Sequence, residues 1–275
     1  EFRRVLFRSV SLPEAHRAGF RIRRPDFSDP ILGTTLLAIA PRVVGLAAIQ
    51  FVFAAFVSTA SNFAEGSITA WNYAFSLLQF PVATIGGAIG SALLPAASRL
   101  VATADRRGLA RAAHGAFGTA IWLILPVAGI GQVIAPGVVA VTLGPSADPS
   151  SVERTAMLLR LLFLGLPAMA ATAVFARLCY SVGDTRGPVG AALAGVAVML
   201  ATQSLLAPVL GLGSLAAAVA IGEWIECGIL LARVRSRVAG PKVRGFLSGV
   251  PTCIALSRSE EHTSELQSQS TISYA

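Results

Sequence analysis

Six long apolar stretches divide this chain, and each is long enough to cross a bilayer as a helix. A membrane-crossing helix needs about 20 apolar residues, because each residue adds roughly 1.5 Å along the axis. The stretches are continuous rather than alternating with a period of two, which excludes a membrane-spanning strand barrel. The pattern therefore predicts an all-α, polytopic membrane protein whose spans cover residues 36–59, 67–94, 112–143, 156–182, 189–208 and 215–234.

Arginine and lysine collect in every second gap between these stretches. One set of flanks holds fifteen basic residues, and the opposite set holds only Arg154. Because short cytoplasmic loops carry the Lys/Arg excess in membrane proteins, the richer set is expected in the cytoplasm. That set comprises Arg17, Arg21, Arg23, Arg24, Arg99, Arg106, Arg107, Arg111, Arg177, Arg186, Arg233, Arg235, Arg237, Lys242 and Arg244.

Composition narrows the class of protein further. The chain is 54% hydrophobic and 13% charged, with a mean hydropathy of +0.69, which is typical of a protein solvated by lipid. The net charge of +8 is explained by arginines that anchor the topology, so nucleic-acid binding is not expected. Cys179, Cys227 and Cys253 show no CxxC spacing and predict neither a zinc site nor a disulfide framework.

The two ends of the chain differ in character from the apolar stretches. Residues 1–9 (EFRRVLFRS) and 258–275 (RSEEHTSELQSQSTISYA) resemble translated sequencing-adapter DNA and are expected to be artefacts of assembly. A disordered cytoplasmic tail is the alternative for the second segment. Residues 10–35 predict a cytoplasmic linker, residues 36–237 the six-helix transmembrane region, and residues 238–257 a cytoplasmic segment that could lead to further helices.

The second apolar stretch carries a line of polar side chains. Thr69, Asn72, Ser76 and Gln79 follow one another at steps of three, four and three, so all four share one face of a helix. Polar side chains inside a membrane either bond to a neighbouring helix or line a cavity that holds water or substrate. The sequence leaves both alternatives open.

A proline and two glycines follow in the same stretch. Pro81 lacks a backbone donor and is expected to bend the helix. Gly86 and Gly90 form a GxxxG face that permits close contact with another helix. A bend combined with a seam of small residues suits either a helix that moves or static packing.

Glu223 and Glu226 are the carboxylates that lie well inside a predicted span, and their spacing places them on one face of the sixth helix. A charge at the bilayer centre costs about 2.5–3.5 kcal/mol on insertion scales. We interpret the pair either as a site for a coupling sodium ion or proton, or as the structural partner of an arginine within the bundle. No other metal site or cofactor is expected.

Two separated segments carry a recognisable pattern. Residues 66–99 read GSITAWNYAFSLLQFPVATIGGAIGSALLPAASR, and residues 165–188 read GLPAMAATAVFARLCYSVGDTRGP. Together they resemble the MviN/MurJ family of lipid II flippases, and the second segment is similar to the family's tenth helix and its GDTR-P loop. The resemblance covers residues 21–237 in outline.

This resemblance implies a transporter of the bacterial inner membrane, built from two six-helix lobes and a final helix pair. Its superfamily is that of multidrug, oligosaccharidyl-lipid and polysaccharide exporters. The chain is similar to the second lobe, helices seven to twelve, so the N-terminal lobe would be its partner. In that family the lobes close alternately on a cationic cavity, and an undecaprenyl-pyrophosphate-linked sugar crosses to the periplasm for peptidoglycan biosynthesis. The candidate cavity residues are Arg42, Thr69, Asn72, Ser76 and Gln79.

The chain departs from the family at Ser76, where members often carry a basic residue. A serine offers phosphate one neutral donor, whereas a pyrophosphate in a low-dielectric slab needs positive partners. Arg42, a turn or two into the first stretch, could supply that charge or could snorkel to the cytoplasmic headgroups. Arg160 and Arg177, near opposite ends of the fourth stretch, are expected to snorkel.

Other functions are weighed against the flippase. The sequence contains no DDxxD-like pair, HExxH or GxSxG motif, so an enzyme is not expected. An exporter of another lipid-linked oligosaccharide, a drug or cation antiporter of the same superfamily, and a transport-inactive scaffold are the alternatives. An antiporter would favour acidic residues in the cavity, which the polar line on the second stretch lacks. No internal sequence repeat is apparent.

Overall fold

The computed structural model describes residues 30–239, apart from several side chains at the start of that range, among them that of Arg42. All regular secondary structure in this part is helical, as the sequence predicts. The elements in chain order are α2 (Pro30–Ala60), α3 (Ser67–Pro81), the π-helix η1 (Val82–Gly87), α4 (Ala88–Ala102), α5 (Arg106–Leu143), α6 (Pro149–Phe163), α7 (Leu166–Ser181), α8 (Arg186–Leu210), α9 (Gly213–Val234) and the π-helix η2 (Arg235–Ala239). The predictions for both chain ends lie outside the described residues.

The chain forms two compact units, Glu1–Ala40 and Pro41–Ala275, and every helix from α3 onward belongs to the second. Within the described residues, four helical segments are long and apolar enough to cross a membrane: Ser67–Ala102, Arg106–Leu143, Arg186–Leu210 and Gly213–Arg237. The pair of α6 and α7 makes a fifth if the two are taken together, and Ala47–Ala60 is a shorter apolar helix. The chain is therefore a multi-pass membrane protein. The total of six spans stays a prediction, because most side chains of residues 36–46 are not described.

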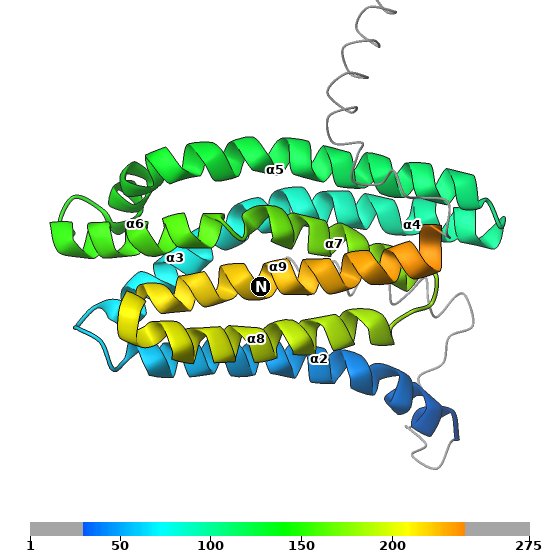
Figure 1. Ribbon diagram of the computed structural model, residues 1–275, viewed down its shortest axis with the longest axis horizontal. Helices are drawn as coiled ribbons and strands as arrows, with labels where there is room; N and C mark the ends of the chain where they lie inside the picture. The colour runs from blue at the N-terminus through cyan, green and yellow to red at the C-terminus, as the bar shows by residue number, and fades with distance from the viewer. Residues whose placement is uncertain (1–29, 240–275) are drawn as a thin grey trace, which may run out of the picture. The chain divides into compact units, whose positions relative to one another are not determined.

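Neighbouring helices of the second unit lie side by side along most of their length (Figure 1). The most extensive contact is between α8 and α9, while α3 packs beside α6 and α4 packs beside α7. The turns at 61–66, 144–148 and 211–212 gather at one end of these helices, and the turns at 103–105 and 182–185 gather at the other (Figure 1). Helices in this arrangement cross a bilayer alternately up and down.

The fourth predicted span, residues 156–182, is not one continuous helix. Two helices, α6 and α7, meet there at 45° across a break at Leu164 and Gly165. The chain tightens as α6 ends, because the backbone N–H groups of Leu164 and Gly165 donate to carbonyls three residues back, at 3.2 and 3.0 Å. Pro167, in the first turn of α7, also has no N–H to donate back across the break.

A break inside a bilayer leaves carbonyl groups without helical donors, and side chains of two neighbouring helices donate to them here. Because the N–H of Leu164 turns to Leu161, the Arg160 carbonyl loses its helical donor. The side-chain amide of Gln132, on α5, donates to that carbonyl at 2.8 Å. The indole N–H of Trp224, on α9, donates to the Leu164 carbonyl at 3.0 Å.

Helix α5 receives a matching bond in return. Pro136 lies within α5 and has no N–H, so the carbonyl of Gln132, four residues earlier, lacks its helical donor. The Nε atom of Arg160 donates to this carbonyl at 2.9 Å. Gln132 and Arg160 thus exchange hydrogen bonds across α5 and α6, each serving a carbonyl that its own helix leaves open.

Glycines allow the helices to approach closely at the break. A Cβ on Gly165 would lie 2.9 Å from the Cα of Ala220 on α9, and a Cβ on Gly131 of α5 would collide with the ring of Phe163. The buried core divides at about the same level. One cluster contains Trp71, Phe56 and Leu162, and the other contains Phe175, Leu178 and Leu230, among other residues.

The break yields a stability prediction. Replacing Gly165 with alanine should lower the free energy of unfolding by about 1–3 kcal/mol, because α7 and α9 must separate to admit the methyl group. Gly137→Ala on α5 is the matched control, since a Cβ there meets nothing within 4 Å, and it should leave stability unchanged or raise it. Thermal unfolding of the full-length protein in detergent measures both. Equal stability of the two variants would contradict close packing at the break.

Candidate substrate and coupling site

The polar line on α3 faces away from the buried core. Thr69, Ser76 and Gln79 are exposed and Asn72 is half-buried. The opposite face of α3 is buried through Ser67, Ala70, Trp71, Ala74 and Leu78. In the described part of the chain, none of the four polar side chains forms a hydrogen bond to another helix. The lining of a cavity therefore stays a prediction, and these residues do not join helices within this part of the protein.

Trp71 fixes the rotation of α3 about its own axis. Its indole is fully buried, lies stacked on Phe75 at 5.6 Å between ring centroids, and meets Phe56 of α2 edge-on at 5.6 Å. A ring of this size in a dense core leaves the helix little freedom to turn. The polar line is consequently held on the outer face.

Pro81 marks a change of helix type rather than a chain break. The α-helix ends at Pro81 and continues as the π-helix Val82–Gly87 before α4 begins. Single π-helical turns inside α-helices are rare and occur frequently at functional sites. Both long membrane elements, α3 with α4 and α6 with α7, are therefore interrupted after a first segment of 15 residues.

The two glycines of the GxxxG face are buried against α7. A Cβ on Gly86 would lie 3.4 Å from the Cβ of Ala173, an ordinary tight contact. Gly90 lies under the side chain of Arg177, since a Cβ there would be 2.6 Å from Nε and 2.8 Å from Cδ. One glycine thus admits a helix and the other admits an arginine.

The two arginines of the broken helix are placed differently from the snorkelling expected of them. Arg160 donates Nε to the Gln132 carbonyl at 2.9 Å instead of reaching only for headgroups. Arg177 is half-buried, and its Nη1 donates at 3.1 Å to the carbonyl of Ala173, one turn back toward the break. The side chain of Arg177 thus follows the tilt of Cα–Cβ bonds toward the N-terminus of its helix.

The proposed coupling residues lie on α9 where it packs against α8. Glu223 and Glu226 are both half-buried. A Cβ on Gly195 of α8 would lie 3.1 Å from a carboxylate oxygen of Glu226, so this glycine makes room for the acid. Neither carboxylate forms an ion pair with an arginine in the described residues, and their role stays a prediction.

The GDTR-P loop is the turn between α7 and α8, and it has a counterpart between α4 and α5. Gly187 donates its backbone N–H to Asp184 Oδ1 at 2.8 Å, and Gly108 donates to Asp105 Oδ1 at 2.8 Å. Each aspartate follows a residue of positive φ, Gly183 at 78° and Ala104 at 55°. The sequence shares only D-x-R-G between these turns, too short a match to reveal the repeat.

Asp184, in the turn between α7 and α8, also contacts α9. Asp184 is nine-tenths buried, and its Oδ2 lies 3.8 Å from Nη1 of Arg233. This contact joins the turn between α7 and α8 to the last turn of α9.

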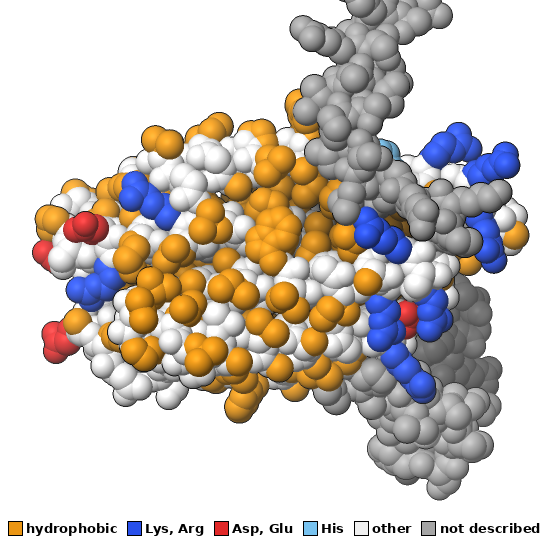
Figure 2. All heavy atoms as spheres, viewed as in Figure 1, with side chains coloured by type: hydrophobic (Ala, Val, Ile, Leu, Met, Phe, Trp, Pro, Cys, Tyr) orange, Lys and Arg blue, Asp and Glu red, His pale blue; other side chains and the backbone are white. Residues whose placement is uncertain are grey.

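Exposed charges segregate to the two ends of the helices. Figure 2 shows most basic side chains at the end that holds the 103–105 and 182–185 turns and two smaller basic groups toward the opposite end, with apolar side chains covering the middle. The exposed arginines of that end are Arg99, Arg106, Arg107, Arg111, Arg186, Arg235 and Arg237. The opposite end carries the exposed acids Glu65, Asp148 and Glu153. This distribution follows the alternation seen in the sequence.

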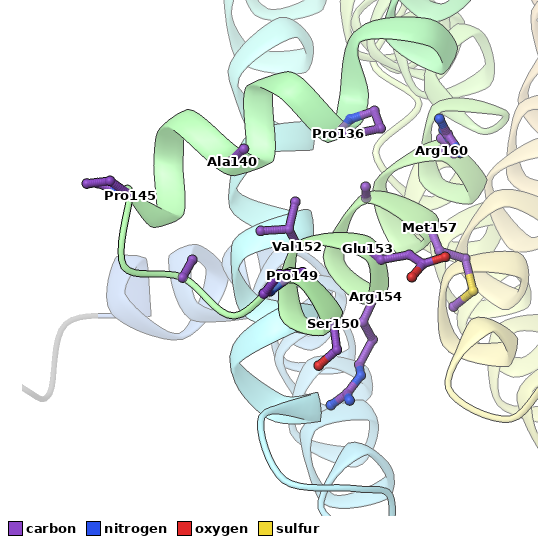
Figure 3. Close-up of a pocket in the computed structure, with 13 residues that line it drawn as sticks. Pro136, Ala140, Pro145, Pro149, Ser150, Val152, Glu153, Arg154, Met157 and Arg160 are labelled. Atoms are coloured by element: carbon purple, nitrogen blue, oxygen red, sulfur yellow. The ribbon is translucent and has the colours of Figure 1, made fainter.

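A cavity of about 920 Å³ opens at the less basic end, between α5 and α6 (Figure 3). Pro136 and Ala140 line it from α5, while Val152 and Arg160 line it from α6. Arg154 also borders it and donates Nη1 to the carbonyl of Glu65, at 2.6 Å, at the start of α3. None of the candidate substrate or coupling residues lines this cavity.

An all-helical bundle with apolar flanks and one basic end defines a multi-pass membrane protein. The sequence model of the family described as lipid II flippase MurJ matches residues 5–257, so the chain belongs to this family. A probable lipid II flippase MurJ of Rhizobium tropici is 27% identical over 207 residues, covering 74% of this chain and 38% of that protein. One of Bdellovibrio bacteriovorus is 25% identical over 236 residues, covering 82% and 45%. The chain thus spans less than half the length of these relatives.

Solved structures share the fold. A lipid II flippase MurJ in an inward closed conformation superposes with a TM-score of 0.67 at 17% identity, covering 85% of this chain and 49% of that one. An outward-facing multidrug resistance MATE family transporter of the MOP superfamily gives 0.59 at 17% identity, covering 75% and 44%.

Thiol labelling tests whether the polar line borders water. A cysteine at Ser76, in the full-length protein freed of its native cysteines, should react with a charged maleimide, because a thiol ionises only where water reaches it. Ala74→Cys, on the buried face, should not react. Val133→Cys on α5 is the lipid control, since its side chain is 77% exposed on a wholly apolar surface and should also stay unlabelled. Mass spectrometry of the intact protein measures the adduct. Equal labelling at Ser76 and Val133 would contradict a water-lined face.

Proposed function

We propose that the chain is the second lobe, helices seven to twelve, of a flippase that carries lipid II from the cytoplasmic to the periplasmic face of the bacterial inner membrane. Membership of the MurJ family is the observation that carries this proposal. The fold shared with a MurJ structure supports it, as does coverage of only 49% of that chain. The N-terminal lobe supplies the other wall of the cavity in this proposal.

The exposed face of α3 is the surface that this lobe turns to the cavity. Its polar side chains offer hydrogen bonds to sugar and peptide groups of the substrate, while the buried Trp71 holds the face in position. The π-helix and the break between α6 and α7 are the points at which the helices of this lobe bend when the cavity changes from facing one side of the membrane to facing the other. Discontinuous helices at mid-membrane are typical of transporters whose sites lie there.

Glu223 and Glu226 are the residues that we assign to a coupling sodium ion or proton. Acids inside a membrane are costly and usually serve pairing or transport. Neither forms an ion pair among the described residues, and this favours a role in coupling over the structural pairing that the sequence also allows. The adjoining Gly195 leaves space beside Glu226 for a small ion.

An antiporter of drugs or cations is the second candidate. The chain shares its fold with a MATE transporter, at a TM-score of 0.59, and this shared fold is the observation that favours an antiporter. Such transporters would favour acids on the cavity face, and the exposed line on α3 carries none. The flippase therefore remains the better proposal.

Genetic complementation tests the proposal. The full-length gene should restore growth to a bacterium depleted of its own lipid II flippase, because the substrate is shared across bacteria that build peptidoglycan. Drug sensitivities measured in the same strain distinguish an antiporter from a flippase, because an antiporter would change drug resistance without restoring growth. Western blotting confirms expression. Absence of rescue at normal expression would contradict the flippase assignment.

A further inference from the structure

The cavity between α5 and α6 lies just beyond the level at which the two helices touch. At that level Phe163 packs on Gly131, and Gln132 exchanges hydrogen bonds with Arg160. From there toward the 144–148 turn, the space between the helices measures about 920 Å³ (Figure 3). Pockets that hold small organic ligands have about 300–1,000 Å³. The cavity is therefore large enough for a phospholipid headgroup and the start of its chains.

The depth of the cavity matches the boundary between hydrocarbon and headgroups. Gly165 is the midpoint of the pair α6 and α7, which together cross the membrane from Pro149 to Ser181. At about 1.5 Å per residue, Arg160 lies roughly 8 Å and Glu153 roughly 18 Å from that midpoint, toward the less basic end. Half of the hydrocarbon core is about 15 Å thick. Arg160 thus lies inside the hydrocarbon and Glu153 at the level of the headgroups.

The walls around these two charges are mainly apolar. Pro136 and Ala140 line the cavity from α5, opposite Val152 of α6 (Figure 3). On the outer surface of α5 beside it, the side chains of Val133 and Val141 are 77% and 85% exposed, as residues that face lipid chains are. An acyl chain of the bilayer can therefore lie along this wall without meeting a polar group of the helix.

Two of the charged groups that line the cavity keep most of their bonding capacity. Arg160 donates Nε to the Gln132 carbonyl, and neither of its Nη groups has an acceptor among the described residues. Glu153 is exposed and belongs to no ion pair in the described part of the chain. Arg154, which also borders the cavity, donates to the backbone at the start of α3 instead. An arginine inside hydrocarbon is costly unless an anion pairs with it.

We propose that this cavity binds a zwitterionic phospholipid, with its phosphate on Arg160 and its primary ammonium on Glu153. Phosphatidylethanolamine has this chemistry. In the bilayer its ammonium lies outermost, its phosphate lies deeper and its chains lie deepest. Glu153 and Arg160 follow the same order, and their spacing of seven residues places them on one face of α6. The guanidinium and the carboxylate each gain a charge-assisted hydrogen bond from such a lipid.

The acid at the mouth of the cavity makes the site selective. A phosphatidylglycerol headgroup carries the same phosphate but no ammonium, so it leaves Glu153 unpaired beside a like charge. The site also differs from the transport pathway proposed above, because it lies on α5 and α6 and contains none of the polar residues of α3. The lipid in this site is a bound component of the membrane rather than the cargo, and the inference goes beyond the proposed function.

Native mass spectrometry of the full-length protein in detergent tests the proposal. The probes are phosphatidylethanolamine, phosphatidylglycerol with the same acyl chains, and soluble glycerophosphoethanolamine. Phosphatidylethanolamine should bind about tenfold more tightly than phosphatidylglycerol, because only its ammonium pairs with Glu153. Equal affinity for the two lipids would overturn the proposal. Competition by the soluble headgroup at equal concentration would overturn a lipid as the ligand.

Two charge variants separate the roles of the acid and the arginine. Glu153→Gln should weaken phosphatidylethanolamine about tenfold and leave phosphatidylglycerol unchanged or bound more tightly, because the repulsion is gone. Glu65→Gln removes an exposed acid at the same end but outside the cavity, and it should bind both lipids as the wild type does. Arg160→Gln should weaken both lipids alike, because both carry the phosphate. A loss confined to one lipid in Arg160→Gln would contradict its assignment to phosphate.

A cavity-filling variant covers the case in which Arg160→Gln disturbs the fold through its lost bond to Gln132. Ala140→Phe places a ring in the cavity without altering a polar group, and it should reduce binding of phosphatidylethanolamine at least tenfold. Val141→Phe, at the next residue of α5 and outside the cavity, is the matched control and should bind normally. Wild-type affinity in both Glu153→Gln and Ala140→Phe would overturn the proposal. Displacement of phosphatidylethanolamine by equimolar undecaprenyl pyrophosphate would overturn a site separate from transport.

Discussion

The hydrocarbon core of a bilayer offers no water to a peptide group, so the backbone groups that a break in a membrane helix leaves open need other hydrogen-bond partners. The break between α6 and α7 meets this requirement through two donors, Gln132 of α5 to the Arg160 carbonyl and Trp224 of α9 to the Leu164 carbonyl. Arg160 of α6 in turn donates to the Gln132 carbonyl that Pro136 leaves open in α5. The bend at mid-membrane consequently depends on the packing of all four helices, and the glycines at 131 and 165 allow that packing.

The π-helix after Pro81 and the half-buried Arg177 lie close together in this lobe. The π-helix after Pro81 lies beside α7, and its Gly86 touches Ala173, whose carbonyl accepts Arg177. The π-helix therefore packs against the segment of α7 that carries Arg177.

Much of the fold is predictable from the sequence because continuous apolar runs leave helices as the main choice in lipid. The spacing of Thr69, Asn72, Ser76 and Gln79 also predicts that they share one face of α3, but not whether that face is exposed. The break was missed because LLFLGLP is apolar throughout, so hydropathy does not change at Gly165. The direction of Arg177 was also missed. Snorkelling was expected from depth alone, whereas side chains tilt toward the N-terminus of a helix, which for α7 lies in the membrane. The close approach of the Arg177 side chain to Gly90 depends on the packing of α4 against α7, which the pattern of residue types along the sequence does not reveal.

All of these features require that the helices cross the membrane with their two sets of turns on opposite sides. Arg106 and Ser146 are exposed in turns or first turns at the two ends. Single cysteines at these positions, in the full-length protein without native cysteines, can be labelled in spheroplasts with an impermeant maleimide. The cysteine at position 146 should react directly, and the one at 106 only after permeabilisation. Reaction of both positions from the same side would contradict the membrane topology on which the account rests.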